Sequence, residues 1–399
     1  MSTIALPRMM RVGGGVLAEV GEALDQLGLR RPVIITDQYL QKSGAVERLQ
    51  SFLSKNGISA AVFADTVPDP TTSCIDMAIK FIKGGDYDCV IGFGGGSPID
   101  TAKAAAVLAL RGGAMRNLKA PHQEDRPGLP IVAIPTTAGT GSEATRFTIV
   151  TDDETNEKML CAGLAYLPTL ALVDYDLTLT MPKRLTADTG IDALTHAIEA
   201  YVSKKANPFS DSMALSAMQL IWNNLRQAFH EPENKSAREG VMLGAMQAGI
   251  AFSNSSVCLV HGMSRPIGAH FHVAHGLSNA MLLPIVTAWS VQGATLRYAN
   301  CARVMGIAET RMSDAAAADK LVEALRDLNA ELEVPNPKSF GIDEHLWNEL
   351  LPLMAEQALE SGSPGNNPRV PDSKEIVQLY DKIWNEALTS SQAGREVNS

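Results

Sequence analysis

The sequence CVIGFGGGSPIDTAK, at residues 89–103, joins an apolar strand to a glycine cluster and then to the first turns of a helix. Glycines let backbone amides approach an anion closely, and Ser97 as the N-cap with Pro98 at the first helical position predicts an electropositive helix start. We therefore expect a diphosphate to bind here, although such a cluster is also typical of a tight turn between a strand and a helix. Asp100, three residues after the predicted cap, would complete a capping box, which is a structural role. The glycines of the cluster are Gly94, Gly95 and Gly96.

Short apolar runs alternate with amphipathic segments in the first half of the chain. The runs lie at residues 32–36, 60–63, 89–93, 131–135 and 170–173. This alternation is typical of a parallel sheet covered by helices on both faces. Beyond a turn-rich stretch, the apolar residues recur with a helical period of about 3.6 instead. The clearest helical segments are 211–229, 237–253 and 314–332. We therefore predict an α/β dinucleotide-binding domain at residues 1–181 and an all-α metal-binding domain at residues 182–399.

The composition excludes several classes of partner. The chain has 399 residues, 45% of them hydrophobic and 20% charged, which is enough for two cores. A net charge of −10 argues against nucleic-acid binding, because the chain lacks the excess of basic residues that attracts the phosphate backbone. Five scattered cysteines fit neither a disulfide framework nor a CxxC metal site, and no apolar run reaches the ~20 residues of a membrane span. We expect a cytoplasmic protein with small-molecule ligands, no nucleic-acid or membrane partner, and a polar tail from about Thr389.

A second loop of small residues, PTTAGTGSE at residues 135–143, follows another predicted strand. Open α/β sheets bind ligands at the carboxyl ends of their strands, so two such loops facing one crevice predict a dinucleotide. Asp37 follows the strand at residues 32–36, where a carboxylate would bind the adenosine ribose and repel a 2′-phosphate. This favours NAD over NADP, but a turn-forming aspartate explains Asp37 equally well.

Two clusters of residues predict a metal site. Asp192 and His196 lie four residues apart in a segment, residues 190–201, that is predicted to begin a helix, so both face one side of it. Such a pair alone is more typical of a helix-terminal charge and a surface histidine. Four of the eight histidines then fall within residues 261–275. Histidines are seldom clustered so closely unless they bind a metal or take part in catalysis. These are His261, His270, His272 and His275. The glycines between them indicate a helix, a turn and a second helix start, so His261 and His275 could converge on one ion.

One carboxylate with up to three imidazoles and no thiolate suits Fe(II), Zn(II) or Mn(II), with one position open for substrate. A cation held in this way can polarise an alcohol or carbonyl oxygen. The nearest cysteine, Cys258, is interpreted as a small buried hydrophobic residue.

The chain resembles the iron-containing (group III) alcohol dehydrogenase family, within the superfamily that includes glycerol dehydrogenase and dehydroquinate synthase. The resemblance extends over essentially the whole chain. Its motifs are GGGSPIDTAK at 94–103, PTTAGTGSE at 135–143, GIDALTHAIE at 190–199, HGM at 261–263, HGLSNA at 275–280 and NPR at 367–369.

The resemblance implies a reversible, NAD(H)-linked alcohol dehydrogenase or aldehyde reductase with Fe²⁺, or alternatively Zn²⁺, and a homodimeric or larger homo-oligomeric assembly. It implies metal ligation by Asp192, His196, His261 and His275. It further implies cofactor contacts by Gly95, Gly96, Ser97, Thr136, Thr137, Thr140 and Ser142, with Lys158 at the ribose. Phe252 would lie beside the nicotinamide or the substrate.

Two residues depart from the family pattern: Arg265 and, as a smaller departure, Ala274, where relatives often have a proline before the fourth ligand. Where many relatives have a histidine four residues after the third ligand, this chain has Arg265, which stays protonated and cannot act as a general base. The proton would then move through water, a ribose hydroxyl, His270 or His272. Arg265 with Arg146 would also favour substrates that bear an anionic group, unless Arg265 forms a structural ion pair.

Two alternatives stand beside the dehydrogenase. A metal-dependent lyase of the dehydroquinate synthase kind shares the cofactor loops but calls for a glutamate and two histidines as ligands, which Asp192 with three histidines disfavours. A non-catalytic NAD or metal sensor on the same scaffold is the second alternative.

Overall fold

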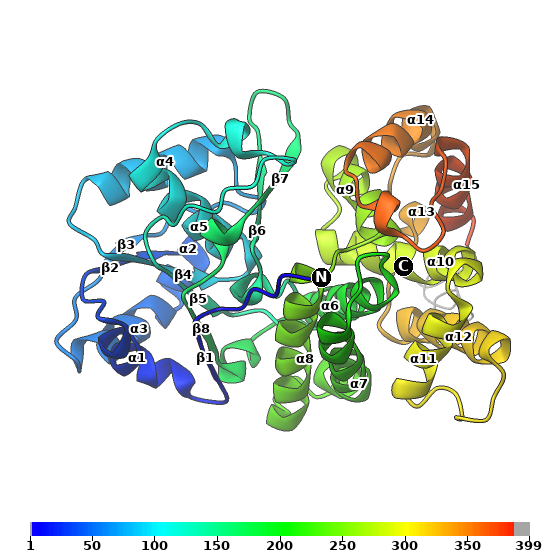
Figure 1. Cartoon of the computed structure of the whole chain (residues 1–399), viewed down its shortest axis with the longest axis horizontal. Coiled ribbons are helices and arrows are strands. Elements are labelled where there is room, and N and C mark those ends of the chain that lie inside the picture. The colour runs from blue at the N-terminus through cyan, green and yellow to red at the C-terminus, as the bar shows by residue number, and fades with distance from the viewer. Residues whose placement is uncertain (1, 387–399) are drawn as a thin grey trace, which may run out of the picture.

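The first half of the molecule is built on a parallel sheet of six strands, in the order β1-β8-β5-β4-β2-β3 (Figure 1). The computed structural model describes residues 2–386. The strands are β1 (Met9–Val12), β2 (Pro32–Ile35), β3 (Ala61–Phe63), β4 (Cys89–Gly94), β5 (Ile131–Pro135) and β8 (Leu170–Val173). Every residue of β2, β4, β5 and β8 is buried, which is why these strands are continuously apolar in the sequence.

Helices cover both faces of this sheet because successive side chains of a strand point in opposite directions. Ile34 of β2 packs with apolar residues of α1 (Val20–Leu27) and α3 (Ala45–Ser54). Val33 and Ile35 pack instead with α4 (Thr72–Lys83) and α5 (Gly96–Arg111). The short helix α2 (Gln38–Lys42) follows β2 directly. The predicted α/β class of this half is confirmed.

The predicted strands are confirmed to within one residue at each end, but three strands were not predicted. β1 lies at the edge of the sheet and is only partly buried. β6 (Phe147–Thr151) and β7 (Lys158–Ala162) form a separate antiparallel hairpin with Phe147 opposite Ala162. Short 3₁₀ helices complete the connections: η1 (Val16–Glu19), η2 (Met115–Leu118), η3 (Ser142–Ala144), η4 (Leu164–Tyr166), η5 (Tyr175–Thr178), η6 (Val291–Gly293) and η7 (Pro364–Asn366).

The start of α5 differs from the prediction. Gly95 is the N-cap and the helix begins at Gly96, so Ser97 lies inside the first turn and caps nothing. The predicted capping box is wrong because the partly buried Asp100 carboxylate turns to η3 and β6, where it accepts hydrogen bonds from Ser142 Oγ at 2.7 Å and the Ile149 backbone N–H at 3.0 Å.

The second half is entirely helical, which confirms the predicted class. Its helices are α6 (Lys183–Val202), α7 (Pro208–His230), α8 (Lys235–Ser253), α9 (Leu259–Phe271), α10 (His275–Ser290), α11 (Thr295–Val304), α12 (Asp314–Glu331), α13 (Pro337–Phe340), α14 (Glu344–Glu360) and α15 (Ser373–Trp384). The predicted segments 211–229 and 237–253 fall within α7 and α8, and the segment 314–332 extends one residue beyond the end of α12. None of the helices in residues 2–386 is long and apolar enough to cross a membrane.

Helix α6 is the centre of this half. It begins at Lys183 rather than near residue 190, and every residue from Gly190 to Val202 is buried. The first two turns, residues 183–189, are partly exposed, and Leu185 is their one large apolar residue, so no apolar stripe of helical period marks them in the sequence. The predicted domain boundary at Met181 stays a prediction, and the predicted tail from Thr389 lies outside the described residues.

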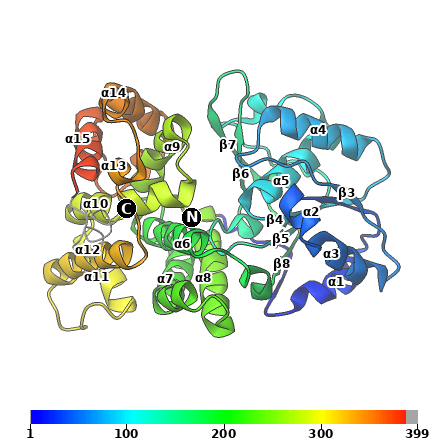
Figure 2. The same ribbon diagram turned by 180° about the vertical axis from the view of Figure 1, so that it is seen from behind.

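The two halves lie side by side, as the opposite views of Figures 1 and 2 show. The β6–β7 hairpin of the first half and α9 of the second half lie on the facing sides. This arrangement places the carboxyl ends of the parallel strands and the buried helix α6 around one shared space.

Candidate active site

A cavity of about 740 Å³ lies between the two halves and receives residues from both. The first half contributes the start of α5, the loop after β5 and the β6–β7 hairpin. The second half contributes α6, α8, α9 and α10. The site residues that line the cavity are Gly96, Ser97, Asp100, Thr140, Ser142, Lys158, Asp192, His196, Phe252, His261, Arg265 and His275. The structure thus brings most of the predicted site together.

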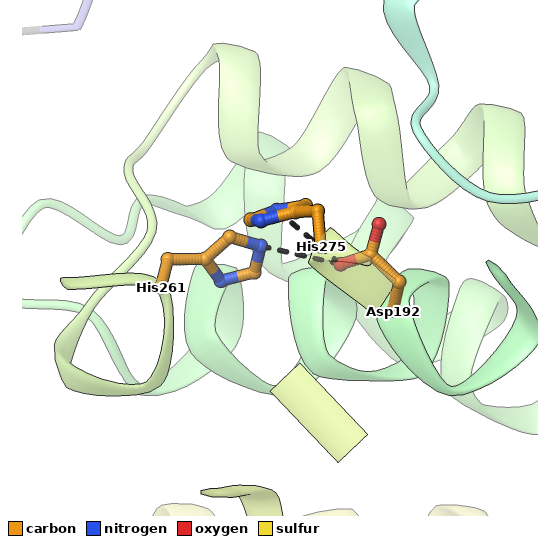
Figure 3. Close-up of side chains that lie close together, drawn as sticks. All are labelled: Asp192, His261 and His275. Carbon is orange, nitrogen blue, oxygen red and sulfur yellow. Dashed lines mark ion pairs between the residues drawn. The ribbon is translucent and has the colours of Figure 1, made fainter. Parts of the chain in front are cut away.

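Three side chains from three helices converge at one end of the cavity (Figure 3). The ligand atoms of Asp192, His261 and His275 all lie within 4.8 Å of one another. Asp192 Oδ1 is 3.5 Å from His261 Nε2 and 3.8 Å from His275 Nε2. Ligands placed about 2.1 Å from an ion at tetrahedral corners are about 3.4 Å apart, so these separations fit a metal site.

His196 lies beside these three residues, one turn after Asp192 on α6, but is not among those whose ligand atoms all lie within 4.8 Å of one another. Its Nδ1 lies 3.9 Å from Asp192 Oδ1 and is buried without a hydrogen-bond partner among the described residues. The imidazole stacks at 4.3 Å on both His261 and Phe252, which holds the ring in place. A buried nitrogen lone pair beside a carboxylate and two further imidazoles is the donor set that a divalent transition metal takes. The residues therefore fit the ion that the sequence predicted.

Glu199 supports the third ligand and was not predicted. Its carboxylate accepts hydrogen bonds from His261 Nδ1 at 2.7 Å, the Cys258 N–H at 2.8 Å and the Val260 N–H at 2.6 Å. Because the proton is on Nδ1, which binds the carboxylate, Nε2 of His261 is the nitrogen that can offer a lone pair to a metal ion. This Nε2 faces Asp192. The sequence did carry a signal, because Glu199 follows Asp192 by seven residues and so lies on the same helical face. Cys258 is buried, as predicted.

Asn279 is a second unpredicted residue of the site. It follows His275 by one helical turn on α10 and is fully buried. Its amide Nδ2 lies 2.6 Å from Asp192 Oδ1 and 3.2 Å from Nε2 of both His261 and His275. Asn279 therefore contacts three of the ligand atoms and fixes their mutual arrangement.

The electrostatics of the cluster favour a bound cation. Burial lowers the pKa of His196 to about 3 and that of His275 to about 4 against the attraction of Asp192, so both imidazoles are neutral and have lone pairs to offer. Burial opposes the charge of Asp192, but the neighbouring histidines outweigh it and hold the pKa of that carboxyl well below its usual range. Burial also opposes a charge on His261, yet Glu199 and Asp192 raise its pKa to about 9. Two buried carboxylates thus face the neutral imidazoles of His196 and His275, whereas His261 must release a proton before its Nε2 can bind an ion.

The two predicted cofactor loops lie against each other. The Thr136 N–H donates to the Gly94 carbonyl at 2.9 Å. A Cβ built on Gly96 would lie 3.0 Å from Thr140 Cγ2, and one on Gly95 would lie 3.5 Å from Thr137 Cγ2. A side chain at Gly96 would press against Thr140, whereas one at Gly95 would make ordinary contact with Thr137, so the close approach of the loops favours glycine at position 96. The fit to a dinucleotide diphosphate is therefore preserved although the helix starts earlier than expected.

Lys158 and Asp37 flank this cradle. Lys158, on β7, lines the cavity and pairs with Asp69 at 3.0 Å. Asp37 is the N-cap of α2, where its Oδ1 accepts from the Leu40 N–H at 2.9 Å, so its turn-forming role is seen directly. Leu40 Cδ1 lies 3.3 Å from where a Gly94 Cβ would stand, which places α2 beside the glycine cluster. The ribose role of Asp37 stays a prediction.

The two predicted catalytic histidines, His270 and His272, lie outside the cavity lining. His270 Nε2–H donates to Gln357 Oε1 of α14 at 2.8 Å, and His272 is the exposed C-cap of α9 with φ of 54°. Neither is among the residues that line the cavity. His261 lines the cavity from the first turn of α9, whereas His270 lies in the last turn of this helix and His272 is its C-cap.

Comparison with known proteins gives full-length matches. A family model described as iron-containing alcohol dehydrogenase matches residues 7–175, and one described as the C-terminal part of the Fe-containing alcohol dehydrogenase family matches residues 186–384. The chain is 40% identical over 354 residues to long-chain-alcohol dehydrogenase 1 of Geobacillus thermodenitrificans, covering 88% of this chain and 89% of that one. It is 35% identical over 380 residues to NAD-dependent methanol dehydrogenase of Bacillus methanolicus, covering 95% and 99%. A solved 1,3-propanediol oxidoreductase matches with a TM-score of 0.92 at 34% identity, covering 96% of this chain and 100% of that one.

Proposed function

Since the chain belongs to the iron-containing alcohol dehydrogenase family and is an oxidoreductase of that kind, we propose that Asp192, His196, His261 and His275 hold its catalytic metal ion. The observation that carries this proposal is the convergence of Asp192, His261 and His275 from three helices, with the unpartnered Nδ1 of His196 beside them. When bound, the ion supplies a Lewis acid for the alcohol or carbonyl oxygen of the substrate.

The chain's own residues orient the reactants around this centre. Glu199 fixes the tautomer and the ring plane of His261, and Asn279 restrains the Asp192 oxygen that faces the histidines. Phe252, stacked on His196 and exposed to the cavity, is the apolar wall against which a nicotinamide ring or a substrate would lie. The cofactor itself supplies the hydride chemistry. The protein's part is to orient the nicotinamide ring and to exclude water, which an apolar wall does.

For the cofactor, we propose NAD rather than NADP. The glycine cradle would bind the diphosphate, Ser97, Thr140 and Ser142 would contact it from the cavity wall, and Lys158 would reach a ribose. Asp37 would disfavour a 2′-phosphate by charge repulsion, and this carries the proposal, because one matching relative is named NAD-dependent and another NADPH-dependent.

We further propose Fe²⁺ as the ion, with Zn²⁺ as the alternative, in a cytoplasmic homodimer or larger homo-oligomer. A lyase is not favoured, because the matching family and relatives are dehydrogenases. A non-catalytic sensor is not favoured for the same reason. Since Arg265 cannot exchange a proton and His270 and His272 lie away from the cavity, we propose that the proton passes through water or a ribose hydroxyl.

Activity after metal removal tests the proposal. Protein purified without oxygen and treated with a chelator should lose NADH-dependent aldehyde reduction, and Fe²⁺ should restore it. His275→Ala should stay inactive after Fe²⁺ is added, whereas His345→Ala, which changes an exposed histidine of α14, should behave as the wild type. Full activity of the chelated protein, or of His275→Ala, would refute the proposed metal centre.

A further inference from the structure

Two arginines line the cavity without a carboxylate partner. Arg265 lies on α9 four residues after His261, so both side chains leave the same face of the helix. Within residues 2–386 its guanidinium forms no ion pair and no hydrogen bond, so the structural ion pair that the sequence left open is not found. Arg146 also lines the cavity, forms no ion pair with any described residue, and has a buried Nε without a hydrogen-bond partner.

The acidic groups of the cavity are engaged elsewhere or lie at its rim. Asp69 pairs with Lys158, and Asp100 accepts from Ser142 and Ile149. Asp192 belongs to the metal centre. Glu360 is exposed and does not come within ion-pairing distance of Arg265. Glu199 attracts the charge of Arg265, but its carboxylate accepts three hydrogen bonds from residues 258–261 and forms no ion pair with Arg265. Neither Arg265 nor Arg146 therefore has a carboxylate of the described residues within ion-pairing distance.

Arg265 and Arg146 are partly buried, and a guanidinium withdrawn from water without a partner is unfavourable unless a ligand neutralises it. Its planar fork of N–H donors matches a carboxylate, which it binds with two parallel hydrogen bonds. A neutral alcohol or aldehyde would leave that requirement unmet. Positions four apart on a helix are separated by about 6 Å along its axis, so a ligand that touches both the metal centre and Arg265 is short, with about two to four carbon atoms between its two polar ends.

We propose that Arg265, with Arg146 on the facing loop, binds a carboxylate of the substrate, so that the enzyme acts on short-chain aldehydes and alcohols that carry an acid group. This inference rests on the proposed function, because it names the substrate class of the same site. Arg265 is then a specificity-determining residue: it fixes the acid end while the substrate oxygen faces the histidine cluster.

Matched aldehydes that differ only in the acid group test this proposal. The Fe²⁺-loaded enzyme with NADH is assayed with succinic semialdehyde and with butanal, both of four carbons. We expect the wild type to prefer the acidic aldehyde, and Arg265→Gln to lower the ratio of kcat/KM values, acidic over neutral, by about 10- to 100-fold, as the loss of a charged hydrogen-bonded pair implies. Arg265→Lys, which keeps the charge but not the fork, should fall between them. Arg311→Gln changes an exposed arginine away from the cavity and should leave the ratio unchanged.

Binding of succinate supplies a readout that needs no turnover. Calorimetric titration of the holoenzyme with succinate should give binding in the wild type that Arg265→Gln weakens by a similar factor, with propionamide as the uncharged comparison. A wild type without preference for succinic semialdehyde, or equal losses for both aldehydes in Arg265→Gln, would overturn the proposal. If the enzyme reduces neither aldehyde, the proposed function fails, and succinate titration alone still tests whether Arg265 binds a carboxylate.

Discussion

Replacing Glu199 by glutamine should weaken metal binding although Glu199 is not a ligand. The carboxylate accepts three buried hydrogen bonds, from His261 Nδ1 and from the N–H groups of Cys258 and Val260. Glutamine has one acceptor oxygen, so its NH₂ must face at least one of these donors and leave a buried group unpaired, at a cost of about 1–3 kcal/mol in unfolding free energy. The imidazole also loses the charge that fixes its tautomer, which typically reduces metal affinity by about 10- to 100-fold.

Competition with a fluorescent chelator measures this effect as a dissociation constant for Zn²⁺, and urea unfolding of the metal-free protein measures the stability separately. Glu239→Gln, an exposed change on α8, is the matched control and should alter neither quantity. A Glu199→Gln protein whose metal affinity stays within twofold of the wild type would refute the argument that this carboxylate orients His261.

Three further changes test other parts of the structure. Asp37→Gly should raise the ratio of kcat/KM for NADPH to that for NADH, and since glycine replaces an N-cap at a cost of only a few tenths of a kcal/mol, an unchanged ratio would count against the ribose role rather than report misfolding. Gly94→Ala should lower the unfolding free energy by about 1–3 kcal/mol in urea, because φ is +149° and the new Cβ would lie 2.6 Å from Pro98 Cγ; an unchanged midpoint would contradict this. Burial raises the pKa of Glu143 from 4.5 to about 7, so its neutral form stabilises the fold below pH 4.5 and this contribution is lost as the pH rises through 7. The unfolding free energy of the wild type relative to Glu143→Gln should therefore fall between about pH 5 and pH 7, and a difference independent of pH would show that the buried carboxyl is not protonated.

The strands could be predicted because burial on both faces leaves a direct trace in the sequence. Residues 131–135 and 170–173 are apolar throughout and form β5 and β8 with those bounds. The hairpin of β6 and β7 was missed because it has no continuously apolar run. Its buried residues alternate with partly buried ones, and they pack against α5 rather than within the parallel sheet. The first turns of α6 were missed because residues 183–189 contain one large apolar residue, Leu185, which is too few to give a helical period.

The sequence predicted which residue types would hold the metal ion, but only partly how these residues lie relative to one another. Spacing along one helix paired Asp192 with His196, whereas a high density of histidines in residues 261–275 could not say which of them face the same cavity. Glu199 and Asn279 were missed because their roles depend on contacts between helices: Glu199 meets the start of α9, and Asn279 meets Asp192 of α6 from α10. The sequence singled out Arg265 as a departure from the family, and only the structure shows that it has no carboxylate partner among the described residues.

The metal content of the reconstituted protein tests the central claim most directly. After anaerobic reconstitution with Fe²⁺ and removal of unbound ions, elemental analysis should find about one ion per chain in the wild type and in His345→Ala. The double variant Asp192→Asn with His261→Ala should hold almost none while keeping the circular dichroism spectrum of the folded protein. One ion per chain in the double variant, or none in the wild type, would contradict the assignment of Asp192, His196, His261 and His275 as the metal centre.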